Sequence, residues 1–149
     1  MAFTMPTSWV TKSFFYEESS YSYVTVIGQG QSGAIKRLLL NGQGSSSLRL
    51  SDVRTSTSLG YLPILAKPGA QTSIIIGFGT GASSSILSRH TKTTTVESEP
   101  KVIKTAGYFA IINAGVFNDK HEIVHDDARH YLQRTANKSD LIANHPLEL

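Results

Sequence analysis

The stretch Thr72-Ser-Ile-Ile-Ile-Gly-Phe-Gly-Thr-Gly81 decides the fold of this chain. It opens with a short apolar run, which is typical of a strand buried on both faces of a parallel sheet. Glycine then recurs at every second position, where a backbone without side chains can adopt positive φ and approach a ligand closely. Residues 82–90 favour a helix, and the free N–H groups of its first turn attract an anionic or electron-rich group. The sequence therefore predicts a strand, a ligand-binding turn and a helix.

Strands and helices alternate downstream of this stretch. Further strands are predicted at residues 93–96, 122–125 and 140–143, and helices at residues 101–110 and 128–135. Alternation of this kind indicates βαβ units and a parallel sheet. The predicted fold class is α/β, with a Rossmann-like nucleotide-binding domain over residues 59–149.

Residues 1–58 are predicted to form a separate β-stranded region. Residues 21–27 alternate and are rich in aromatic and β-branched residues, as strands are. Residues 35–40 supply a second strand, which ends at the turn signal Asn41-Gly42. Together they predict an N-terminal β-hairpin.

The segment between this hairpin and Thr72 gives weaker signals. Residues 45–58 are polar and rich in serine and threonine, which predicts a loop with short strand pieces. Residues 59–66 predict a short helix, stopped by Lys67-Pro-Gly69.

A second glycine motif, Gly28-x-Gly30-x-x-Gly33, matches the dinucleotide-binding fingerprint as a string. That fingerprint requires a helix after the glycines, so that the helix N-terminus faces a phosphate. Here a predicted strand follows, so the motif is interpreted as a hairpin turn.

Composition bounds the class of protein. The 149 residues are 40% hydrophobic and 17% charged, as in an ordinary globular domain, and the formal net charge is +3. The cations are scattered and do not form the clustered stripe that nucleic acid binding uses. No apolar run approaches the roughly 18 to 20 residues of a membrane span. Cysteine is absent, which fits a reducing compartment, so a cytoplasmic protein without nucleic-acid or membrane partners is expected.

Acidic residues follow two of the predicted strands. Glu97 ends the second strand, twenty residues after Gly77, where a carboxylate can accept hydrogen bonds from ribose hydroxyls. The alternative to this ribose-binding role is that the segment forms a tight turn and Glu97 is an exposed acid. Asp126 and Asp127 follow the third strand and can accept from an adenine amino group, or they cap the next helix.

The histidines do not predict a metal site. His121 and His125 are four residues apart, but in a strand this spacing separates them by about 13 Å. No Gly-x-Ser-x-Gly elbow of a serine hydrolase occurs either.

Several segments together resemble the spermidine synthase family, in its bacterial spermidine synthase-like branch. They occur in that family's order and spacing, and the N-terminal stretches Phe15–Tyr21 and Leu38–Gly42 are similar to its β-stranded N-terminal domain. The segments of the α/β domain are Ser73–Gly81, Thr95–Pro100, Phe109–Val116 and His125–Leu132.

The resemblance implies a class I methyltransferase-like fold and an aminopropyltransferase. The implied donor is decarboxylated S-adenosylmethionine (or S-adenosylmethionine), and the implied acceptor is a polyamine such as putrescine, with no metal. By motif position, the loop of Gly77, Gly79, Thr80 and Gly81 lines the donor. Glu97 holds the ribose. Asp127 and Ala128 meet the adenine.

Three features depart from the family pattern. His145 stands where the family has its catalytic aspartate, just after the fourth strand; a neutral histidine can act as a base near pH 7. Thr57-Ser58 stand where many members have His-Glu. The chain also ends at Leu149, whereas a domain of this class continues, so we expect a truncated domain that comprises the front half only.

These departures leave two alternatives to the aminopropyltransferase. One is a catalytically degenerate protein that binds a nucleoside and transfers nothing. The other is an S-adenosylmethionine-dependent methyltransferase, which shares the donor loop. An open sheet edge at residues 140–143 also makes a homo-oligomer possible.

Overall fold

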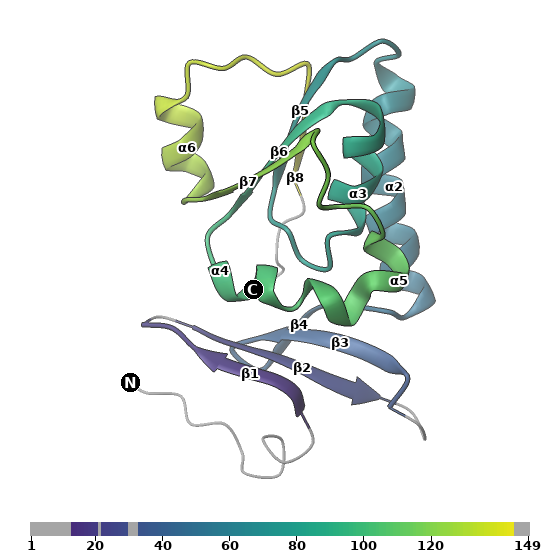
Figure 1. The fold of residues 1–149 in the computed structure, drawn as a ribbon, viewed down its shortest axis with the longest axis vertical. Helices are drawn as coiled ribbons and strands as arrows, with labels where there is room; N and C mark the ends of the chain where they lie inside the picture. The colour runs from purple at the N-terminus through teal and green to yellow at the C-terminus, as the bar shows by residue number, and fades with distance from the viewer. Residues whose placement is uncertain (1–12, 21, 30–32, 145–149) are drawn as a thin grey trace.

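The computed structural model describes residues 13–20, 22–29 and 33–144, and two sheets make up its framework (Figure 1). The first sheet is antiparallel, with strand order β1-β2-β3-β4. The second is parallel, with order β7-β6-β5-β8. The predicted mixed α/β class with a parallel sheet is confirmed.

The helices lie on both sides of the parallel sheet. Figure 1 shows α2 and α3 on one side and α6 on the other, with α4 and α5 between the parallel and antiparallel sheets. The strands are β1 (Ser13–Glu18), β2 (Tyr23–Gln29), β3 (Ile35–Leu40), β4 (Gln43–Ser47), β5 (Thr72–Ile76), β6 (Lys92–Glu97), β7 (His121–His125) and β8 (Leu141–Asn144). The helices are α2 (Leu50–Ala66), α3 (Ala82–His90), α4 (Pro100–Lys104), the 3-10 helix η1 (Ala106–Phe109), α5 (Ala110–Asn113) and α6 (Ala128–Arg134).

The strand and helix that flank the glycine loop have the predicted bounds. β5 occupies residues 72–76 and α3 occupies residues 82–90. The isoleucines of β5 are largely buried, because β6 and β8 pair with it on its two sides and helices cover the sheet. A short run of β-branched residues is stable in this setting.

The N-terminal hairpin is confirmed as the pair β2–β3. The turn signal Asn41-Gly42 joins β3 to β4, with φ values of 51° and 79°. Positive φ at both central residues matches the twist of the flanking strands, which is why this pair of residues is favoured there. The Gly28-Gly30-Gly33 motif lies between β2 and β3, and Gly30 is outside the described residues.

The loop predicted over residues 45–58 is wrong for most of that segment. β4 accounts for its beginning, and the 17-residue helix α2 occupies residues 50–66. This helix has no broad apolar stripe, and its buried positions are the small residues Ser56 and Gly60. Close packing on α3 stabilises a segment whose composition favours a loop, because tertiary contacts override weak intrinsic propensity.

The domain boundary predicted between residues 58 and 59 falls inside α2, and the division into two domains stays a prediction.

Two hydrophobic clusters hold the elements together. One joins the antiparallel sheet to the segment from α4 to α5, with Val24, Leu38 and Phe109 almost fully buried. The other lies between the parallel sheet and the α2–α3 side, around Ile75 and Leu87. The first cluster also includes Phe78 of the glycine loop, so it holds β2 and β3 near the carboxyl end of β5.

Gly60 should be required for the close contact between α2 and α3. A Cβ atom at this position would lie 2.7 Å from Cβ of Ile86. We expect Gly60→Ala to lower the free energy of unfolding by about 1–3 kcal/mol through overpacking, although alanine favours a helix by about 1 kcal/mol. Urea denaturation measures this, with Gly107→Ala as the control because nothing lies within 4 Å of a Cβ there. Equal stability of Gly60→Ala and the wild type would contradict the expected overpacking.

Candidate functional site

Three neighbouring strands end at the same edge of the parallel sheet. Ile76 pairs with Val96, and Glu97 pairs with His125, so the carboxyl ends of β5, β6 and β7 are side by side. The glycine loop follows β5, Glu97 ends β6, and Asp126 follows β7. In open α/β sheets, ligands bind outside this edge.

A cleft with a volume of about 190 Å³ opens at this edge. Leu40 and Ser45 of the antiparallel sheet form part of its wall, so the two sheets enclose it together. Of the predicted binding residues, the cleft is lined by Gly77, Gly79, Glu97, Asp127 and Ala128. Thr80 and Gly81 do not line it.

Thr80 and Gly81 instead shape the loop. The N–H of Gly81 donates to the carbonyl of Phe78 at 2.8 Å, and Gly81 has a φ of 81°. A Cβ atom on Gly81 would lie 2.6 Å from the Phe78 ring, so any larger residue would displace that ring. Thr80 is buried, and its carbonyl accepts a hydrogen bond from the side-chain amide of Asn113 at 2.7 Å.

Glu97 is buried, with 8% of its surface exposed, and its carboxylate holds two backbone segments. Oε2 accepts from the N–H of Phe78 and Oε1 accepts from the N–H of Glu99, both at 2.8 Å. The sequence allowed two interpretations of Glu97, and the one that made it an exposed acid after a tight turn is therefore wrong. Each carboxylate oxygen has a second lone-pair direction, so Glu97 can also accept from a ligand hydroxyl.

For Asp127 the helix-capping alternative is confirmed, and the contact with an adenine stays a prediction. Its carboxylate caps α6 by accepting from the N–H of His130 at 3.0 Å, and the residue lines the cleft. Asp126 also lines the cleft, and it accepts from the side chains of His130 and Arg134. The hydrogen bond from His130, with the nearby charge of Arg134, lowers the pKa of Asp126. The Asp126 carboxylate therefore presents negative charge to the cleft near pH 7.

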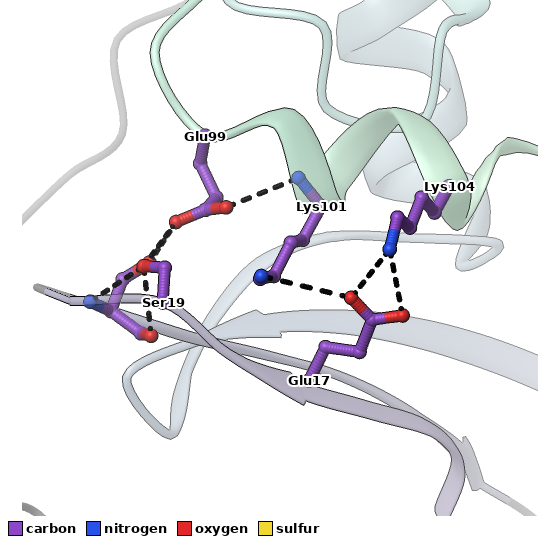
Figure 2. Close-up of polar contacts among 6 residues, drawn as sticks. Glu17, Ser19, Glu99, Lys101 and Lys104 are labelled. Carbon is purple, nitrogen blue, oxygen red and sulfur yellow. Dashed lines mark hydrogen bonds and ion pairs between the residues drawn. The ribbon is translucent and has the colours of Figure 1, made fainter.

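A polar contact between the antiparallel sheet and α4 supports the cleft from outside, and the sequence did not point to it (Figure 2). The buried carboxylate of Glu99 accepts from the hydroxyls of Ser19 and Ser22 and from the N–H of Lys101. Beside it, Glu17 on β1 pairs with Lys104 at 2.7 Å and with Lys101. Glu99 directly follows the cleft residues Glu97 and Ser98, so this contact fixes the turn that forms one wall.

His145, the predicted catalytic residue, lies outside the described residues; Asn144 before it lines the cleft. His121 is half-buried on β7, where Nδ1 lies 2.7 Å from the Val116 carbonyl and Nε2 lies 2.8 Å from the Thr95 hydroxyl. Burial lowers the pKa of His121.

Within residues 13–20, 22–29 and 33–144, no three His, Asp or Glu side chains gather as a metal site would require. No helix in the same part of the chain is long and apolar enough to cross a membrane.

Solved spermidine synthases have this arrangement of elements. The enzyme from Thermotoga maritima superposes with a TM-score of 0.78 at 19% identity, over 89% of this chain and 47% of that one. A spermidine synthase in complex with the transition state analogue AdoDATO gives a TM-score of 0.80 at 18% identity, over 92% and 47% of the two chains. The fold is that of the spermidine synthases.

A third structure, a probable spermidine synthase from Corynebacterium glutamicum, gives a TM-score of 0.63 at 17% identity, over 87% of this chain and 50% of that one. The chain thus spans about half the length of the solved structures that it matches. No protein-family model and no curated protein sequence matches it. At this level of identity the likeness establishes the fold.

The buried contact at Glu99 should make stability depend on acid pH. Burial alone raises the pKa of Glu99, but hydrogen bonds from Ser22, Ser19 and the Lys101 backbone outweigh it and lower the pKa. A carboxyl with a lowered pKa in the folded state contributes stability above its unfolded pKa of about 4.3, and this stability is lost as the pH falls through the folded pKa.

We therefore expect Glu99→Gln to lower the melting temperature at pH 7 and to flatten its decline below about pH 4.5. Thermal melts followed by circular dichroism between pH 2.5 and 7 measure both effects. Glu122→Gln is the control, because Glu122 is exposed on β7 and its side chain has no hydrogen-bond partner among the described residues. Parallel pH curves for Glu99→Gln and the wild type would show that Glu99 has no such role.

Proposed function

We propose that the cleft binds an S-adenosylmethionine-type nucleoside and that the chain is a spermidine synthase-like aminopropyltransferase. The observation that carries this proposal is the meeting of Gly77, Gly79, Glu97, Asp127 and Ala128 around one cleft at the carboxyl ends of β5, β6 and β7. These residues come from three separate segments, and the parallel sheet is what brings them together.

Each group suits one part of the nucleoside. Gly77 and Gly79 have no side chains, so the ligand can lie against the loop backbone. The buried carboxylate of Glu97 can accept from the ribose hydroxyls, and charge-assisted hydrogen bonds of this kind are strong. Asp127 and Ala128 are at the start of α6, where the Asp127 carboxylate can accept from the adenine amino group. The similar structure in complex with AdoDATO supports a ligand of this type.

The proposed reaction is a displacement at carbon. An acceptor amine attacks the aminopropyl carbon next to the sulfonium of decarboxylated S-adenosylmethionine, the new C–N bond forms, and the C–S bond breaks to release methylthioadenosine. The attacking nitrogen must first lose a proton to a base. His145, directly after cleft residue Asn144, is the candidate for that base. The protein otherwise contributes alignment of donor and acceptor.

A second candidate is nucleoside binding without transfer. It is favoured by the cavity beside the cleft, whose charged lining residues are Arg37, Arg49 and Asp52. A polyamine carries several positive charges, and two arginines repel it. A methyltransferase would share the donor loop and is distinguished by its products.

We expect Glu97→Ala to weaken methylthioadenosine binding by about 1.5–3 kcal/mol, because charged hydrogen bonds to the ribose are lost. Isothermal titration calorimetry measures this on protein shown to be folded by circular dichroism. The control is Glu122→Ala, which removes an exposed acid that does not line the cleft. Unchanged affinity in Glu97→Ala would remove Glu97 from the ligand site.

Turnover is tested separately, by following methylthioadenosine release from decarboxylated S-adenosylmethionine with putrescine across pH 6 to 9. Release that requires putrescine supports the aminopropyltransferase. Nucleoside binding without release supports the second candidate, and methyl transfer from S-adenosylmethionine supports a methyltransferase.

A further inference from the structure

A second cavity, of about 470 Å³, adjoins the cleft. Its wall comes from β3, β4 and the first part of α2. Ser45 and Asn144 line both cavities, so the two are direct neighbours. A ligand held in the cleft can therefore extend into the second cavity, or meet another ligand there.

The charge of the second cavity is positive. Its charged lining residues are Arg37, Arg49 and Asp52, and the other lining residues are neutral. The carboxylate of Asp52 already accepts hydrogen bonds from Ser47 at 2.5 Å and from Ser51 at 3.0 Å. Among the described residues, neither arginine forms an ion pair with Asp52. Two arginines and one aspartate leave the cavity with a formal charge of +1, and Asp52 holds neither guanidinium in an ion pair.

Arg37 is held in place by its surroundings. It lies on β3, is half-buried, and its guanidinium lies over Gly44 of β4, where a Cβ atom would lie 2.0 Å from Nη2. The Arg37 side chain makes no hydrogen bond or ion pair with any residue that the structure describes. Arg49 is exposed, and its Nη2 donates to the side chain of Gln29 at 2.9 Å. A half-buried guanidinium without an anion has five donors available and is costly to desolvate.

We propose that the second cavity binds a carboxylate group. A guanidinium matches a carboxylate with two parallel hydrogen bonds, which gives both geometry and strength. The ammonium groups of a polyamine would instead meet Arg37 and Arg49. This proposal rests on the proposed nucleoside site, because that site would hold a donor beside the second cavity. Two ligands can supply the carboxylate: the methionine part of intact S-adenosylmethionine, or an amine acceptor that carries a carboxylate.

The test uses Arg37→Gln, with Arg54→Gln as a matched control, because Arg54 is on the same helix as Asp52 but does not line the cavity. Calorimetric titrations compare methylthioadenosine, decarboxylated S-adenosylmethionine and S-adenosylmethionine. If the donor supplies the carboxylate, S-adenosylmethionine binds at least about tenfold more tightly than its decarboxylated form, on the scale of hydrogen bonds between charged groups. Arg37→Gln then removes the difference and leaves methylthioadenosine binding unchanged, whereas Arg54→Gln alters neither.

If an acceptor supplies the carboxylate, the two donors bind equally, and the second cavity is probed with succinate and putrescine in saturating methylthioadenosine. Succinate then binds, putrescine does not, and Arg37→Gln weakens succinate binding at least about tenfold. Equal binding of the two donors together with no succinate binding overturns the proposal. Putrescine binding more tightly than succinate also overturns it.

Two further measurements separate this proposal from its premises. If the wild type does not bind methylthioadenosine, the proposed nucleoside site fails, and titration with succinate alone still decides the carboxylate site through its sensitivity to Arg37→Gln. If Arg37→Gln does not fold, as judged by circular dichroism, Arg49→Gln takes its place, because Arg49 is exposed at the rim of the same cavity.

Discussion

The carboxylate of Glu97 accepts two backbone hydrogen bonds, one from Phe78 in the glycine loop and one from Glu99 in the turn before α4. These donors belong to segments that follow two neighbouring strands, so one buried side chain holds both sides of the cleft floor. A buried carboxylate without such donors would be costly, and backbone N–H groups aimed into the interior without an acceptor would be costly as well. Each group therefore stabilises the other. The shape of the glycine loop, and so of the cleft, depends on this interaction.

The antiparallel sheet depends on the same turn. Glu99 lies in the segment held by Glu97, and its carboxylate accepts hydrogen bonds from Ser19 and Ser22, which lie between β1 and β2. Apolar packing of Val24 and Leu38 against the α4–α5 segment also joins the antiparallel sheet to the rest of the fold. As a result, β3 and β4 form a wall of the cleft and carry the arginine-lined cavity beside it. A separate sheet thus contributes to both cavities, although the sequence analysis predicted no donor-binding residue in it.

The glycine-rich segment was predictable, because it is governed by local rules. The bounds of β5 and α3 follow from an apolar run, glycines and a helix pattern that needs no distant partner. The second half of α2 was predicted as a helix over residues 59–66, but its first half was missed for the opposite reason. Its serine- and threonine-rich sequence forms a helix because Gly60 allows α3 to approach closely, and because the carbonyl of Ser56 accepts from Ser83 on α3. No periodicity within residues 50–66 records those contacts.

The sequence by itself determined the α/β class, the order of strands and helices from Thr72 onward, and the residue types at the ends of β5, β6 and β7. Periodicity and glycine spacing encode these features, because they depend on neighbours along the chain. Only the tertiary structure decided that the Glu97 carboxylate holds two backbone segments and that Asp127 both caps α6 and lines the cleft. It also decided that Arg37 lies unpaired beside Gly44. These are relations between residues far apart in sequence, set by strand pairing and by the docking of one sheet against another, and no local pattern specifies them.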